Sequence, residues 1–199
     1  MAKVIQNQNK LMSPPASAYF IAENKQQVER HTLSVVVDNL PGVLARVIGL
    51  FSGRGYNIES LTVSETEHDN HLSRITIVTA GTPDVLEQIK RQLARMVPVH
   101  RVVDLTLRAR ELGHEKALER ELALVKVSGK GENRVEALRL AEAFGAIVAD
   151  ANTSHFVFEV TGRANKIDQF IDIMTPLGLV EVCRTGIAAM NRGPSGMQD

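Results

Sequence analysis

The sequence is short of cysteine, with only Cys183 among its 199 residues. A single thiol can form neither an internal disulfide framework nor a cluster of thiolate metal ligands, so disulfide-stabilised and thiolate-zinc proteins are excluded. Cys183 lies in an apolar run beside Val182. We therefore expect a buried, inert thiol rather than a nucleophile at this position.

The sequence also lacks an excess of charge of either sign, because 23 Lys and Arg residues balance 23 Asp and Glu residues. General nucleic-acid and membrane-surface binders carry a basic excess, so we predict no nucleic-acid partner. One basic cluster stands out locally and comprises Lys90, Arg91, Arg95, His100 and Arg101. A solvated helix face is the favoured interpretation of this cluster, ahead of an acidic partner surface and then of nucleic acid.

Long hydrophobic runs are missing as well. No apolar segment approaches the length of a membrane span, and the first residues lack the apolar core of a signal peptide. We expect a cytoplasmic protein with no membrane partner.

Catalytic and metal-binding motifs are equally scarce. No G-x-S-x-G nucleophile motif is present. His68 and His71 lie three residues apart in a predicted hairpin loop, but no third ligand is evident. Ser128–Gly131 (SGKG) lacks the G-K-[ST] ending of a phosphate loop and is interpreted as a flexible turn. We therefore predict no catalytic residue and no metal site.

Periodicity begins at Thr32, after a polar segment at 1–30 that we interpret as a disordered tail. In the first half, the patterns predict strands at 32–37, 56–64, 72–79 and 98–107, and helices at 41–54 and from 82 onward. This order is βαββαβ, which predicts a two-layer ferredoxin-like unit at 31–107.

The same order returns after a charged segment at 108–121, which we interpret as a linker. The second set comprises strands at 122–127, 146–151, 155–161 and 179–188, and helices at 133–144 and 164–174. Aligning Leu33 with Ala123 gives an offset of 90 residues between the two sets (123 − 33). We predict an α+β fold of two tandem ferredoxin-like βαββαβ domains, the second at 122–190, followed by a flexible tail at 191–199.

The start of the first predicted helix, Pro41–Arg54, is the strongest candidate site. Proline suits the first helical position, which places the cap on Leu40, a residue with no side-chain oxygen. The free N–H groups of Gly42 and Val43 would then need another acceptor, and the positive end of a helix favours an anion.

Two asparagines could contribute polar groups to such a site. Asn39 precedes the helix and Asn57 follows it, and each amide can donate and accept hydrogen bonds. From the residues alone the structural alternative stays open, in which Asn39 is itself the helix cap and Asn57 is a turn residue.

The stretch Asp38–Val63 (DNLPGVLARVIGLFSGRGYNIESLTV), with Leu33–Val37 before it, resembles the regulatory small subunits of acetolactate synthase, or acetohydroxyacid synthase. These proteins carry an ACT domain, a βαββαβ module that binds small amino acids. The resemblance covers Thr32 to Met190. Further matching segments are Leu72–Thr76, Leu86–Ile89, Gln92–Leu93 and Arg120–Lys126.

The resemblance implies a regulatory subunit without an active site. Such subunits dimerise through the ACT domain, bind a branched-chain amino acid at the dimer interface, activate a separate catalytic large subunit and confer feedback inhibition. Valine is the favoured effector, ahead of leucine and isoleucine. Thiamine diphosphate, Mg and FAD are expected only on the catalytic subunit.

Carried over by position, six residues would form the effector site, with the last two supplied by the partner chain: Asn39, Gly42, Val43, Leu44, Asn57 and Ile58. Two alternatives remain. One is an amino-acid-sensing module that controls transcription or another enzyme, although neither a helix-turn-helix nor an appended catalytic domain is evident. The other is an independent enzyme on the same fold, which would need a convergent polar site.

Overall fold

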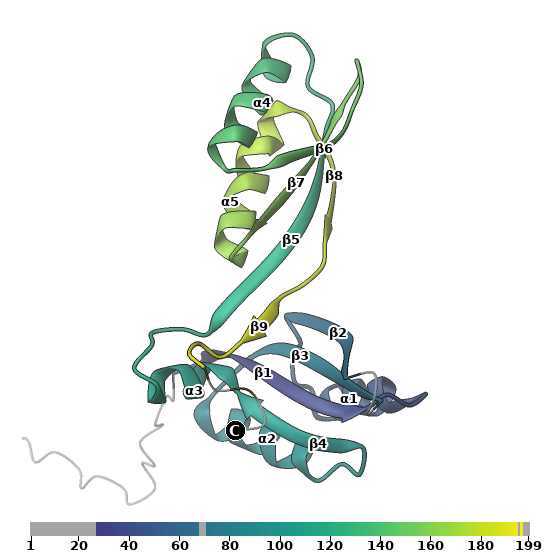
Figure 1. The fold of residues 1–199 in the computed structure, drawn as a ribbon, viewed down its shortest axis with the longest axis vertical. Coiled ribbons are helices and arrows are strands. Elements are labelled where there is room, and N and C mark those ends of the chain that lie inside the picture. Colours follow the sequence, from purple (N-terminus) through teal and green to yellow (C-terminus); the bar gives the residue numbers. More distant parts are fainter. Residues whose placement is uncertain (1–26, 68–70, 195, 197–199) are drawn as a thin grey trace, which may run out of the picture.

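The computed structural model describes residues 27–67, 71–194 and 196, so most of the predicted amino-terminal tail, and His68, lie outside the described residues. The chain forms two α+β units stacked end to end in an elongated molecule (Figure 1). Within the described residues, none of the helices has the length and apolar character needed to span a membrane.

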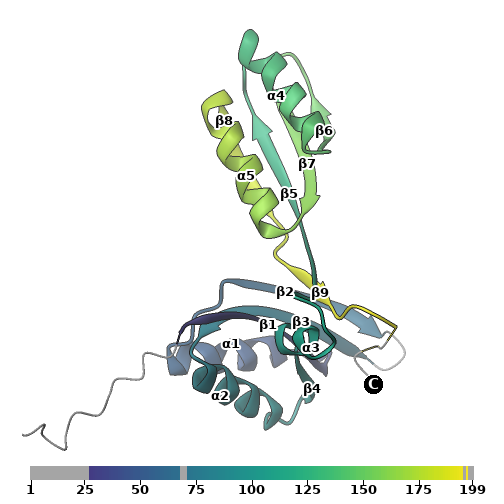
Figure 2. The same cartoon turned by 90° about the vertical axis from the view of Figure 1, so that its left-hand side faces the viewer.

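The first unit has the predicted βαββαβ order. Its elements are β1 (Glu29–Asp38), α1 (Val43–Arg54), β2 (Ser60–Glu67), β3 (Leu72–Gly81), α2 (Pro83–Ala94) and β4 (Val99–Asp104). All strand pairs are antiparallel and the sheet order is β2-β3-β1-β4. Figure 2 shows α1 and α2 side by side against one face of this sheet.

Alternation along β1 explains this packing. Successive side chains of a strand point to opposite faces, so Leu33, Val35 and Val37 share one face. All three are buried and belong to one core cluster with Val47 and Phe51 of α1.

The second unit repeats the arrangement. Its elements are β5 (Leu118–Val127), α4 (Glu132–Ala143), β6 (Ile147–Ala151), β7 (Phe156–Gly162), α5 (Ala164–Met174), the short 3-10 helix η1 (Thr175–Leu177), β8 (Leu179–Arg184) and β9 (Ala188–Met190). The sheet order β6-β7-β5-β8 matches that of the first unit, and β9 pairs with the start of β5. The predicted class, two tandem α+β units, is confirmed.

The predicted offset of 90 residues extends to an irregularity in the sheets. The pairing of β1 with β4 shifts register between Val36 and Val37. The pairing of β5 with β8 shifts register between Lys126 and Val127, which lie 90 residues further on (126 − 36 and 127 − 37). The two units therefore share a bulge as well as an order of elements.

The sheet of the first unit has a partial layer on its other face. Helix α3 (Leu105–Glu111) overlaps the start of the segment predicted as a linker, and its Asp104 cap accepts hydrogen bonds from the backbone of Thr106 and Leu107. A buried cluster joins α3 and β9 to β3 and comprises Val78, Leu105, Ala109, Ala117, Ile187 and Ala189. Residues from the end of the chain therefore complete the packing of the first sheet.

Cys183 is exposed, so the predicted buried thiol is wrong. Val182 packs against the core of the second unit, and its neighbour along the strand therefore faces the opposite way. The register places Cys183 opposite Leu124, which is itself 38% exposed.

His31 forms a buried ion-pair centre beside the α3 cap. Its Nδ1 lies 2.7 Å from a carboxylate oxygen of Asp104, and its Nε2 lies 3.3 Å from Glu29. Asp104 also lies 3.8 Å from the Lys90 amine, and Glu29 bonds Arg110 of α3. The hydrogen bond to Asp104 raises the pKa of His31 against the opposing effect of burial, and Glu29 raises it further.

We expect the stability of the chain to fall as pH rises because of His31. A group with a raised folded pKa binds a proton that the unfolded chain releases near pH 6.5, so its contribution is complete below about pH 6.5 and is lost as pH rises through the folded pKa. Urea unfolding at several pH values should show this decline in the unmodified chain and lose it in His31→Gln. His114→Gln, which alters an exposed histidine, is the control. An unchanged pH dependence in His31→Gln would contradict the assignment.

Candidate functional site

The turn before α1 differs from the prediction by two residues. The helix begins at Val43, and its cap is Gly42, with φ of 84° in the left-handed region, instead of Leu40. The predicted start at Pro41 is therefore wrong, because Pro41 and Gly42 form a turn in which the Val43 N–H donates to the Leu40 carbonyl at 3.3 Å. Left-handed backbone favours glycine, so Gly42 suits this position better than any residue with a Cβ.

Asn39 does not cap the helix. The backbone N–H of Asn39 donates to the carbonyl of His71 at 2.7 Å, which fixes the end of β1 against the start of β3. Asn39 is exposed to solvent. Gly42 as cap makes no side-chain bond, and a Cβ placed on it would meet nothing within 4 Å. The helix start is thus open to solvent beside an exposed amide, while Val43 turns into the core.

The second pair of predicted residues lies at the other end of α1. The segment before β2 is irregular, so the predicted strand start at Tyr56 is wrong and β2 begins at Ser60. Asn57 is exposed, and its backbone carbonyl accepts a hydrogen bond from the buried Thr79 hydroxyl at 2.6 Å. Ile58 is partly buried against the core.

Helix α1 separates these two groups within one chain. It has 12 residues, which corresponds to about 18 Å along the helix axis. The structure therefore brings Asn39, Gly42, Val43 and Leu44 together at one end and leaves Asn57 with Ile58 at the other.

Three exposed apolar side chains, which we call the strip, lie on α1 and on the edge strand β2. Leu44 and Ile48, one turn apart on α1, are 37% and 36% exposed, and Val63 on the edge strand β2 is 43% exposed. Exposed apolar side chains such as these can be covered by a second chain.

The other candidates from the sequence are explained by local contacts. In the basic cluster, Lys90 and Arg91 pair with Glu87, and His100 pairs with Asp38 at 2.6 Å. These pairs favour the solvated-face interpretation.

The Ser128–Gly131 turn is fixed by packing, because the Ser128 N–H donates to Gly178 and a Cβ on Gly129 would lie 2.9 Å from the Leu177 carbonyl. This contact favours the turn over a phosphate loop. Among the residues that the structure describes, no group of three His, Cys, Asp or Glu side chains is placed to hold a metal.

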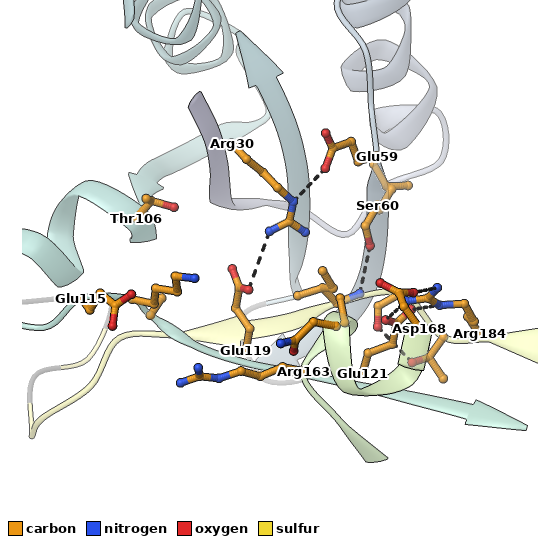
Figure 3. A pocket seen from close by; sticks show the side chains of 18 of the residues that line it. Arg30, Glu59, Ser60, Thr106, Glu115, Glu119, Glu121, Arg163, Asp168 and Arg184 are labelled. Carbon is orange, nitrogen blue, oxygen red and sulfur yellow. Dashed lines mark hydrogen bonds and ion pairs between the residues drawn. The ribbon is translucent and has the colours of Figure 1, made fainter. Parts of the chain in front are cut away.

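A cleft of about 840 Å³ lies between the two units and was not predicted (Figure 3). Its walls carry charges of both signs, and several are paired. Arg30 lies 2.8 Å from Glu59, and Arg184 bonds both Glu121 and Asp168. The lining residues come from distant parts of the chain, so no local pattern in the sequence indicates them.

The βαββαβ unit at the start of the chain, with its helices on one face, is an ACT domain, as the family match over residues 33–101 shows. A family described as AHAS small subunit-like ACT domain matches residues 33–101, and one described as small subunit of acetolactate synthase matches residues 120–193. The chain belongs to the acetolactate synthase small subunit family.

Individual relatives agree with this assignment. A probable acetolactate synthase small subunit of Archaeoglobus fulgidus is 45% identical over 164 residues, which cover 82% of this chain and 98% of that protein. The isozyme 3 small subunit of Escherichia coli is 44% identical over 85% of this chain and 99% of its own length. The crystal structure of the Thermotoga maritima small subunit matches with a TM-score of 0.75 and 36% identity, covering 84% of this chain and 99% of that one.

Proposed function

We propose that this regulatory subunit binds a branched-chain amino acid, with valine favoured, between the ACT domains of two chains. The subunit itself would activate a catalytic large subunit, and the bound effector would weaken that activation, which is feedback inhibition. Thiamine diphosphate, Mg and FAD would belong to that catalytic subunit, and the complex would act in branched-chain amino acid synthesis in the cytoplasm.

The separation of the two residue groups along α1 carries this proposal. About 18 Å of helix lies between Gly42 and Asn57, so one chain cannot close a pocket around a small amino acid. A two-fold axis across the strip of Leu44, Ile48 and Val63 would place the Gly42 end of one chain beside the Asn57 end of the other. The dimer would cover the strip and form two equivalent pockets.

The chemistry of the two ends suits an amino acid. The predicted free N–H of Val43 is bonded to the Leu40 carbonyl, so it is not available to a ligand. The positive end of the helix and the other first-turn N–H groups still favour a carboxylate at this open start. The side-chain amide oxygen of the partner's Asn57 would accept a hydrogen bond from the ammonium group of the effector. Apolar side chains such as Ile58 would contact the effector side chain.

Calorimetric titration of the purified chain with valine, leucine and isoleucine tests the proposal. We expect one effector per chain, with valine and isoleucine separated by about fourfold or less, because one buried methylene is worth about 0.8 kcal/mol. The titration is repeated with the catalytic subunit present, where inhibition can be followed in parallel. Absence of binding to all three, with and without the catalytic subunit, would refute the proposal.

Asn39→Ala should weaken valine binding by about 1.5 kcal/mol, roughly tenfold, which is the low end for a hydrogen bond to a charged group because Asn39 is exposed. The matched control is Asn133→Ala, which removes an exposed amide from the first turn of α4 in the second unit. Equal effects of the two substitutions would contradict a binding role for Asn39.

A further inference from the structure

Two hydroxyl groups at the start of β2 hold a segment that leads to the second unit. The Ile187 N–H donates to the Ser60 hydroxyl at 2.9 Å, and the Thr62 hydroxyl donates to the Ile187 carbonyl at 3.0 Å. Ile187 lies between β8 and β9 and is only 4% exposed. Both of its backbone groups are thus bonded by β2 of the other unit.

Gly186 makes this contact possible. It has φ of 82°, and a Cβ added to it would lie 2.9 Å from the Thr62 methyl carbon and 3.0 Å from the Ser60 oxygen. Any larger residue would push the segment away from β2. We call Ser60, Thr62, Gly186 and Ile187 the clasp.

A second link runs from Glu59, just before β2, through Arg30 of β1 to β5. Glu59 pairs with Arg30 at 2.8 Å, and Arg30 lies 3.9 Å from Glu119 of β5. Figure 3 shows Arg30 between the two carboxylates on the wall of the cleft. These charges are partly exposed, so we expect the pairs to orient the units more than to stabilise them.

The clasp is joined to the proposed effector pocket by a short, restrained piece of chain. Asn57 and Ile58 immediately precede Glu59, whose N–H donates to the Val78 carbonyl at 2.8 Å. The Asn57 carbonyl is held by the buried Thr79 hydroxyl. Because only Ile58 and Glu59 lie between them, we expect a displacement of Asn57 to move Ser60 as well.

We propose that the clasp couples effector binding in the ACT domain to the orientation of the second unit. The inference rests on the proposed function and adds the structural route by which effector binding would reach the second unit. An effector bound at Asn57 shifts the start of β2, the clasp passes this shift to the segment between β8 and β9, and the second unit turns at the point where β5 changes partners. By linkage, breaking the clasp removes the coupling while the pocket itself remains.

The test uses the double variant Ser60→Ala, Thr62→Val in the full chain, with valine as the probe. Hydrogen exchange of residues 184–190 is measured with and without valine, calorimetry gives the valine affinity, and inhibition is measured with the catalytic subunit. In the unmodified chain, valine should change exchange in this segment by at least about fivefold, the lower end of allosteric coupling. The double variant should bind valine within about threefold, yet show neither the exchange change nor the inhibition.

Two further variants keep the test decisive. Ser64→Ala removes a hydroxyl from the same strand and the same face without touching the clasp, and it should behave as the unmodified chain. Gly186→Ala displaces the segment sterically and should reproduce the double variant, which covers the case in which the double variant fails to fold.

The outcomes separate the two proposals. Valine binding and inhibition without any exchange change in 184–190 of the unmodified chain, or inhibition retained in both clasp variants, would overturn the clasp and leave the effector site standing. Absence of valine binding in the unmodified chain, with and without the catalytic subunit, would overturn both.

Discussion

Gly42→Asp should abolish the response to valine, with a loss of affinity of at least about 100-fold. The substitution places a carboxylate at the open start of α1, where the effector carboxylate is proposed to bind. The two negative charges would lie side by side and repel each other. Nothing lies within 4 Å of the new Cβ, so the side chain projects into free space and not into the core. Folding and activation of the catalytic subunit should survive.

The backbone at Gly42 adds a second, smaller effect. Its φ of 84° is unfavourable for any residue with a Cβ, so each substitution there should cost about 1 kcal/mol of stability. Gly42→Ala carries this strain without the charge and is the matched control. Gly49→Ala, inside α1 and also free of contacts within 4 Å, should be neutral or stabilising.

Calorimetry and inhibition assays on these three variants distinguish the causes. Loss of binding in Gly42→Asp with only a few-fold change in Gly42→Ala supports a carboxylate site. Equal losses in both would show that backbone geometry matters and charge does not. Full valine inhibition in Gly42→Asp would place the effector elsewhere.

Arg184→Met should destabilise the second unit by about 2–3 kcal/mol. Arg184 bonds Glu121 through two nitrogens, at 2.9 and 2.6 Å, and Asp168 at 2.7 Å. Glu121 raises the pKa of the guanidinium, against the effect of its partial burial. Since Glu121 is only 5% exposed, removing its partner leaves an uncompensated carboxylate. The estimate is below the usual 3–5 kcal/mol because a third of the Arg184 side chain remains in solvent.

Lys126→Met is the matched control, because the Lys126–Glu181 pair joins the same two strands at 3.1 Å but is exposed. We expect a loss of at most about 0.5 kcal/mol there. Adding Glu121→Gln to Arg184→Met should recover part of the lost stability, since it removes the unpaired charge. Urea unfolding followed by circular dichroism measures all of these values. Equal small losses in Arg184→Met and Lys126→Met would contradict a buried pair.

The order of elements was predictable because it depends on local periodicity. Leu33, Val35 and Val37 alternate along β1, which places them on one face of the sheet. The register shift shared by the two units was found only in the structure. We predicted a buried Cys183 and were wrong, although the same alternation, which turns the neighbour of an inward Val182 outward, indicates an exposed side chain.

Other features depend on contacts that no local pattern encodes. Pro41 predicted a helix that begins at residue 41. In the structure the left-handed backbone of Gly42 places the first helical residue at Val43. The residues alone pointed to Asn39, Gly42, Val43 and Asn57, and the family resemblance added Leu44 and Ile58. The cap at Gly42 and the bond that occupies the Val43 N–H required the structure. The cleft and the clasp arise from how β5 and β9 set one unit against the other, so they could not be predicted from either unit alone.

The strand β9 makes the first unit discontinuous in sequence, with a consequence for how the chain folds during synthesis. Ile187 and Ala189 bury Val78, Leu105 and Ala109, yet they are translated after the whole of the second unit. At about 5–20 residues per second, the roughly 80 residues that separate Ala109 from Ala189 take some 4–16 s to make. For that interval the far face of the first sheet has α3 but lacks Ile187 and Ala189, and its completion waits for the second unit to emerge. A fragment cut after residue 107 would never leave that incomplete state.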